Sequence, residues 1–118
     1  MKIKEFIGID VSKLTLDIRL HLAEHSCEFD NTPCGISKML RWVEKFTGFK
    51  RENLFFIFEH TGLYSYQLSH QLTKLSIAYT MEPGLAVKRS LGITRGKDDH
   101  IDAIKLALYG YRLRDESI

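Results

Sequence analysis

Two carboxylates stand where apolar segments of the chain would otherwise continue. Asp10 interrupts the β-branched run Phe6–Val11, and Glu59 ends Leu54–Phe58, the most apolar run in the chain. A carboxylate at the end of a buried strand has lost part of its hydration, so it must be paired, hydrogen-bonded or bound to a metal ion. If the two strands are neighbours, both acids lie at one edge of a sheet. For either acid alone, the alternative is a strand end capped by backbone N–H groups.

Two further aspartates have the spacing of one helix face. At about 100° per residue, Asp99 and Asp102 lie about 60° apart around a helix, so both can reach one point. The alternative is a capping role, since aspartates are favoured in a first helical turn and Asp98 or Asp99 can be the N-cap. Four converging carboxylates repel one another unless divalent cations lie among them, and hard oxygen ligands suit Mg²⁺ or Mn²⁺. The predicted catalytic residues and metal ligands are Asp10, Glu59, Asp99 and Asp102.

Such a site has a well-defined chemistry. Two divalent cations about 3.5–4 Å apart support in-line attack on a phosphodiester, one by activating the nucleophile and the other by stabilising the leaving oxygen. The expected cofactor is therefore Mg²⁺ or Mn²⁺, and the expected substrate is a nucleic acid.

A basic segment immediately precedes the last aspartates. Residues 88–97 contain no acid and four cations, namely Lys88, Arg89, Arg95 and Lys97. We expect these side chains to bind phosphates, which the carboxylates alone would repel. The alternative is a solvated connecting loop. The net charge of +2, from 17 Lys and Arg against 15 Asp and Glu, is too small to indicate a nucleic-acid binder, so local charge must supply that role.

Hydrophobic periodicity predicts the elements that position these residues. Alternation from Leu14 to Leu22 indicates a half-solvated strand, and helical spacing from Ile36 to Phe46 indicates a helix that Gly48 closes. Thr61 is expected to cap the next helix. The predicted strands are residues 6–11, 14–22, 26–29, 54–58 and 77–81, and the predicted helices are 36–46, 64–75 and 99–113. Three antiparallel strands followed by alternating helices and strands predict an α/β fold with one mixed sheet, in the order of the ribonuclease H-like fold.

Composition limits the class of protein. The 118 residues, 44% hydrophobic and 27% charged, fit a single domain over 1–118. No apolar run approaches the roughly 20 residues that cross a bilayer, and the N-terminus lacks the pattern of a signal peptide, so we expect a cytoplasmic protein. Cys27 and Cys34 lie without a CxxC or Cys/His cluster, and we expect two reduced thiols.

Three segments resemble the motifs of a known family. The bacterial insertion-sequence transposases of family one-ten, which include the pilin-gene DNA invertases, have similar motifs in the same order and spacing. The segments in this chain are Gly8-Ile9-Asp10-Val11-Ser12-Lys13, Glu59-His60-Thr61-Gly62-Leu63-Tyr64 and Gly96-Lys97-Asp98-Asp99-His100-Ile101-Asp102-Ala103. The resemblance covers essentially the whole chain.

The resemblance implies an N-terminal domain like the RuvC Holliday-junction resolvase, with an Asp-Glu-Asp-Asp metal site. By motif, the metal ligands are Asp10, Glu59 and the pair Asp99 and Asp102. Asp98 stands where the family usually has threonine, which leaves the choice between Asp98 and Asp99 open, and we prefer Asp99 for its three-residue spacing. His60 replaces a small residue common in the family.

The resemblance also implies partners. Family members continue into a second domain with a catalytic serine, which lies outside these 118 residues, and some are directed to DNA by a structured RNA. The expected role is that of a DNA transposase or recombinase domain acting in strand exchange, incomplete when alone. Two alternatives are a non-catalytic nucleic-acid or protein interaction module and an actin-like ATPase, although the latter would need a glycine-rich phosphate loop after Asp10.

The last helix predicts self-association. One stripe, formed by Ala103, Leu106, Gly110 and Leu113, suits packing on the sheet, and a second apolar stripe lies nearly opposite. The second stripe consists of Ile101, Ile104, Leu108 and Tyr111. In the intact protein we expect this stripe to contact the portion outside these residues or a second subunit, and in this chain to form a homo-oligomer, a two-fold dimer. The alternative is that the helix from Tyr64 to Leu75 covers it.

Overall fold

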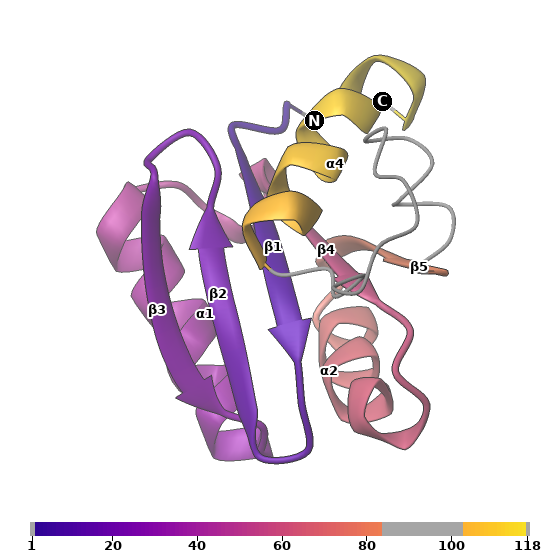
Figure 1. Cartoon of the computed structure of the whole chain (residues 1–118). Coiled ribbons are helices and arrows are strands. Elements are labelled where there is room, and N and C mark those ends of the chain that lie inside the picture. The colour runs from indigo at the N-terminus through magenta and orange to yellow at the C-terminus, as the bar shows by residue number, and fades with distance from the viewer. Residues whose placement is uncertain (1, 84–102, 118) are drawn as a thin grey trace.

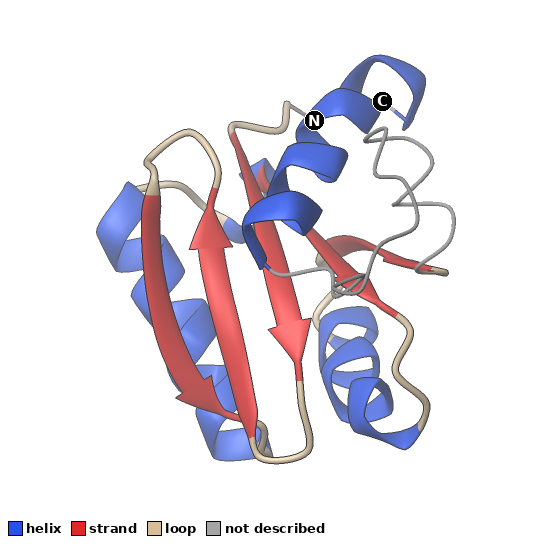
Figure 2. Ribbon diagram, in the orientation of Figure 1, coloured by secondary structure: helices blue, strands red, loops and turns tan. Residues whose placement is uncertain are grey.

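The computed structural model describes residues 2–83 and 103–117, and the side chains of 2–83 and 103–113. These residues form a five-stranded sheet with helices on both faces (Figure 1 and Figure 2). In chain order the elements are β1 (Glu5–Val11), β2 (Thr15–Leu20), β3 (His25–Asp30), α1 (Pro33–Thr47), the 3₁₀ turn η1 (Arg51–Asn53), β4 (Leu54–Glu59), α2 (Leu63–Lys74), β5 (Ala78–Glu82) and α4 (Ala103–Ser117).

The sheet has the strand order β3-β2-β1-β4-β5. The first three strands pair antiparallel, whereas β1 pairs with β4 and β4 with β5 in parallel. This mixed sheet confirms the predicted ribonuclease H-like fold. Its central strands are β1 and β4, whose carboxyl ends meet at the same edge.

One face of the sheet packs against α1 and α2. Alternate strand residues point to this face, where they form an apolar core with both helices: Ile7 and Ile9 of β1, Leu16, Ile18 and Leu20 of β2, Phe56 and Phe58 of β4, Met39 and Val43 of α1, and Leu68 and Leu72 of α2. α2 therefore lies on the face opposite α4 and does not cover the described part of the second stripe, Ile104, Leu108 and Tyr111.

The predicted strand from Leu14 to Leu22 was too long at both ends. Leu14 and Leu22 are 72% and 53% exposed, because each belongs to a turn and not to the ladder. Ser12 closes the first turn by donating from its amide to the Thr15 carbonyl oxygen (2.9 Å). Apolar alternation alone does not reveal where such turns begin.

The second turn is held by a buried carboxylate. Glu5 is only 2% exposed, and its side chain accepts hydrogen bonds from the amides of Phe6 (2.9 Å), Leu22 (2.8 Å) and Ala23 (2.9 Å). These donors satisfy the carboxylate after it has lost its water. Glu5 thus fixes the β2–β3 turn to the start of β1.

The helix ends follow ordinary capping chemistry, with one exception. Thr32 caps α1 by accepting from the Gly35 amide, and Gly48 ends that helix in the left-handed conformation (φ 73°). Thr61 was expected to cap α2, and that prediction was wrong. The N-cap is Gly62 (φ 62°), and the Ser65 hydroxyl donates to the Gly62 carbonyl oxygen (3.0 Å).

The other face of the sheet packs against α4, which lies in front of β1 in Figure 1. Phe6 and Ile57 form a second apolar cluster with Leu106 and Tyr109 of the helix. None of the described helices has the length and apolar character needed to span a membrane.

Candidate functional site

Asp10 and Glu59 lie on neighbouring strands. β1 pairs with β4 in a register whose last pair is Ile9 and Phe58, and Asp10 and Glu59 directly follow these residues on the two strands. Phe6 and Ile57, which alternate with these acids along their strands, pack under α4. Because strand side chains alternate between faces, Asp10 and Glu59 both lie on the α4 face, at the carboxyl ends of parallel strands. The predicted adjacency of the two strands is confirmed.

Three carboxylates that the sequence did not single out extend this arrangement. Asp17 on β2 pairs directly with Asp10, Glu28 on β3 pairs with Asp17, and Glu82 on β5 pairs with Glu59. Paired residues share a face of the sheet, and neighbouring strands lie about 4.8 Å apart. The result is a line of acids across all five strands, which we call the carboxylate row: Glu28, Asp17, Asp10, Glu59 and Glu82.

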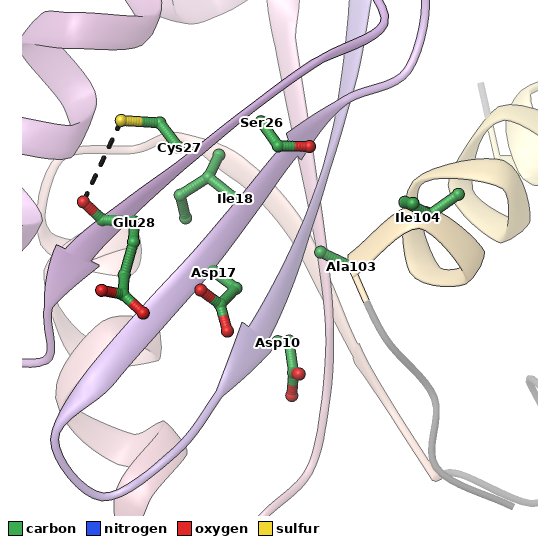
Figure 3. A pocket seen from close by; sticks show the side chains of 8 residues that line it. All are labelled: Asp10, Asp17, Ile18, Ser26, Cys27, Glu28, Ala103 and Ile104. Atoms are coloured by element: carbon green, nitrogen blue, oxygen red, sulfur yellow. Dashed lines mark hydrogen bonds between the residues drawn. The ribbon is translucent and has the colours of Figure 1, made fainter. Parts of the chain in front are cut away.

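A pocket opens over one half of the carboxylate row. Its volume is about 430 Å³, and Asp10, Asp17 and Glu28 line it together with Ala103 and Ile104 at the start of α4 (Figure 3). Three strands therefore supply the acidic floor, and the helix supplies an apolar wall.

Gly8 sets how closely α4 approaches the pocket. A Cβ atom on Gly8 would overlap the Ala103 carbonyl oxygen and the Ala107 amide nitrogen, so only glycine lets the helix backbone lie on β1. The small side chains of Ala103 and Ala107 serve the same contact, and both residues are buried. Gly8 belongs to the same motif as Asp10, and its function is to seat the first turn of α4 beside that acid.

The other predicted site residues lie outside the described part of the chain. They are the carboxylates Asp99 and Asp102 and the cations Lys88, Arg89, Arg95 and Lys97. In sequence, Asp102 directly precedes Ala103, the residue that contacts Gly8 and lines the pocket. Of the four predicted ligands, Asp10 and Glu59 lie in the described residues, and both lie at the same edge of the sheet.

The described residues do not form a metal centre by themselves. Within them, no group of three or more His, Cys, Asp or Glu side chains is close enough to hold an ion. The carboxylate row is a line and not a cluster. Its oxygen donors are nonetheless of the type that Mg²⁺ and Mn²⁺ prefer. The donor chemistry of Asp10 and Glu59 fits a divalent cation, provided that further ligands come from outside the described residues.

The turn after Asp10 does not resemble a phosphate-binding loop. The Ser12 amide donates to the Thr15 carbonyl oxygen, and the Thr15 amide donates to the Ser12 hydroxyl oxygen (3.1 Å). These amides are therefore already used within the turn, whereas a phosphate loop directs its amides to the nucleotide. This geometry counts against the actin-like ATPase alternative.

Comparison with known proteins identifies the family. A family model described as a transposase, the DEDD type of insertion-sequence family IS110, matches residues 7–117. The chain belongs to this transposase family. No curated protein matches the chain.

Family membership agrees with the fold and the site. DEDD transposases have a RuvC-like domain with the ribonuclease H-like strand order seen here, and the role of such a protein is DNA transposition. The parallel pairing of β1 and β4 brings Asp10 and Glu59 side by side within the residues that the family model matches.

Asp17, Glu28 and Glu82 are the residues that sequence reasoning missed. A signal for Asp17 depends on where the hairpin turn lies, because the predicted turn at Val11-Ser12-Lys13 would set Asp10 opposite Leu14. The observed turn is Ser12–Thr15, and counting outward from it pairs Asp10 with Asp17. Glu82 had no comparable signal, since the register of two parallel strands depends on the packing of the helix between them.

Proposed function

We propose that this chain is the metal-dependent catalytic domain of the transposase, acting on DNA phosphodiesters during strand exchange. The observation that carries the proposal is the placement of Asp10 and Glu59 in register at the carboxyl ends of β1 and β4. The close contact between Ala103 and Gly8 also supports the proposal. It holds the start of α4 beside the strand that carries Asp10, and Asp102 directly precedes Ala103 in the sequence.

Asp10, Glu59, Asp99 and Asp102 would hold Mg²⁺ or Mn²⁺, with Asp99 preferred over Asp98 as the third ligand. A bound divalent cation supplies the positive charge that stabilises a phosphodiester under attack. Asp10 and Glu59 contribute rigidity, because both are attached to the central strands of the sheet and their backbone positions are fixed by the ladder.

Lys88, Arg89, Arg95 and Lys97 would hold the phosphates of the DNA over the site. The carboxylate row repels a polyanion, so cations from elsewhere in the chain must offset it. Neutralising all four cations should lower the slope of log affinity against log salt by up to about four units, if each contacts a phosphate of duplex DNA.

Residues 1–118 would form the RuvC-like domain of a larger recombinase, partnered by a domain with a catalytic serine and in some relatives by a guide RNA. Self-association would use the exposed side of α4. Ile104 is 55% exposed there, whereas Tyr111 packs on Phe6 at a ring distance of 5.4 Å, so the association surface is narrower than the full second stripe. Sedimentation of wild type beside Ile104→Glu tests this, and a wild type that stays monomeric at high concentration contradicts it.

Calorimetric titration with Mn²⁺ tests the metal site. We expect a binding heat for wild type that Asp10→Asn and Glu59→Gln each reduce strongly, since each removes one charged oxygen ligand. Glu52→Gln is the matched control, because Glu52 is exposed and lies in η1, before β4 begins. Equal heats for wild type and Asp10→Asn would favour the alternative of a non-catalytic interaction module.

A further inference from the structure

The outer surface of α1 carries a stripe of cations. Lys38, Arg41 and Lys45 are all exposed, and at about 100° per residue they fall within about 60° of arc around the helix. Within the described chain, none of the three takes part in an ion pair or hydrogen bond. The single acid of this helix, Glu44, is held by Arg51 at 2.9 Å and so does not neutralise the stripe.

A stack of aromatic rings flanks this stripe. Phe46 lies against His25 with ring centroids 4.5 Å apart and planes at 17°, and against Trp42 at 5.3 Å and 29°. His25 comes from the edge strand β3, so the stack joins that strand to α1. A purely structural contact between two elements would not need exposed rings. Phe46 is nevertheless 46% exposed, and His25 is also exposed. The surface therefore offers unpaired cations beside partly exposed aromatic rings.

We propose that this surface, the basic ridge of Lys38, Arg41, Lys45, Trp42, Phe46 and His25, binds single-stranded DNA. Lys and Arg side chains neutralise phosphates, and bases free of a duplex stack on aromatic rings. A duplex offers its phosphates but keeps its bases stacked inside, so the rings select for a single strand. The choice of DNA rests on the proposed function, since DNA is the polymer on which the family acts.

The basic ridge lies on the face of the sheet opposite the carboxylate row. α1, through Val43, shares an apolar cluster with Ile7 and Ile9 on one side of the sheet, whereas Asp10 and Glu59 lie on the α4 side. A DNA strand bound at the basic ridge is therefore separated by the sheet from a phosphodiester bound at the carboxylate row. The ridge would hold a displaced or flanking strand while the other face acts on DNA.

Trp42 gives a direct readout, because it is the single tryptophan of the chain. The whole chain is titrated with oligo-dT of about 20 nucleotides, a length above one typical site size, in buffer with a metal chelator. We expect Trp42 fluorescence to be quenched on binding and the affinity to fall with salt. Because no metal is present, the metal site does not contribute to this binding, so failure of the metal site leaves this result unaffected.

Charge removal tests the cationic stripe. The triple variant replaces Lys38, Arg41 and Lys45 by Gln. It should lower the slope of log affinity against log salt concentration by about two units, because each phosphate contact on a single strand contributes about 0.7. The control removes three exposed cations from other elements, by Lys2→Gln, Lys74→Gln and Arg112→Gln, and should leave the slope near the wild-type value. Equal slopes for wild type and the first variant would overturn the proposal.

Ring removal tests the stacking. Phe46→Leu keeps an apolar side chain but loses the ring face, and should weaken oligo-dT binding by about fivefold or more, whereas Phe46→Tyr should bind like wild type. Equal binding by both variants would refute stacking. Tighter binding of a duplex than of oligo-dT would overturn the single-strand assignment, and tighter binding of oligo-rU would overturn the choice of DNA.

Discussion

The two faces of the sheet are built from the same strands but carry different kinds of side chain. On the face of α1 and α2, alternate residues are large and apolar and form the main core. On the α4 face, the same strands carry Phe6, Gly8 and Asp10 in β1 and Phe55, Ile57 and Glu59 in β4, so apolar contact gives way to acid at the carboxyl ends. A strand period of two residues allows one short segment to build a core and a site at once.

Charge differs between the two sides as well. The carboxylate row lies on the α4 face, whereas the exposed surface of α1 is cationic through Lys38, Arg41 and Lys45. The net charge of +2 averages over these regions and reveals neither. For a small domain that acts on a polyanion, the segregation of charge carries more information than its sum.

The largest expected effect concerns the contact that seats α4. Gly8→Val should destabilise the fold by several kcal/mol, because the new side chain meets the backbone of Ala103 and Ala107, which cannot move without displacing the helix. Urea unfolding followed by circular dichroism measures the change. Ala78→Val is the control, since Ala78 is exposed on the edge strand β5. If the two variants are equally stable, α4 does not rest on Gly8.

A smaller loss is expected from the buried carboxylate on the α1 side of β1. Glu5→Ala leaves the amides of Leu22 and Ala23 without their acceptor and should cost about 2–3 kcal/mol in the free energy of unfolding. Glu5→Gln retains one acceptor oxygen and should lose less. Glu52→Ala, at an exposed glutamate, should be nearly neutral under the same unfolding assay. If Glu5→Ala is as stable as Glu52→Ala, Glu5 does not hold the β2–β3 turn to the start of β1.

The smallest effect has the opposite sign. Asp17→Asn should stabilise the metal-free chain by about 0.2–1 kcal/mol, because it relieves a direct cross-strand contact between two carboxylates, Asp10 and Asp17. Asp30→Asn provides the matched change, since Asp30 pairs with Thr15 and meets no acid there. Thermal unfolding in chelator compares them. If Asp17→Asn is no more stable to heat than Asp30→Asn, the acids of the carboxylate row do not repel one another enough to affect stability.

The sequence predicted the elements that local chemistry defines. The helical spacing from Ile36, the glycine at 48 and the apolar run from Leu54 gave α1 and β4 close to their observed bounds, because caps and hydrophobic periods act within a few residues. The order of elements then sufficed for the fold class and for the adjacency of Asp10 and Glu59.

Features that depend on tertiary contacts were missed or misplaced. Thr61 has the side chain of a good cap, but a left-handed Gly62 turns the chain and starts α2 instead. Glu5 was not singled out from the sequence, because its burial depends on the approach of the β2–β3 turn. The carboxylates of β2, β3 and β5 required the sheet register, which a single sequence encodes only indirectly.

The central claim is that Asp10 and Glu59 hold a divalent cation between the ends of β1 and β4. A crystal grown with Mn²⁺ and measured for anomalous scattering tests it most directly. We predict an anomalous peak within about 2.0–2.2 Å of carboxylate oxygens from both Asp10 and Glu59, the distance expected for a small divalent cation. A peak bound only by Asp17 and Glu28, or no peak at this edge in a Mn²⁺-saturated crystal, would contradict the account.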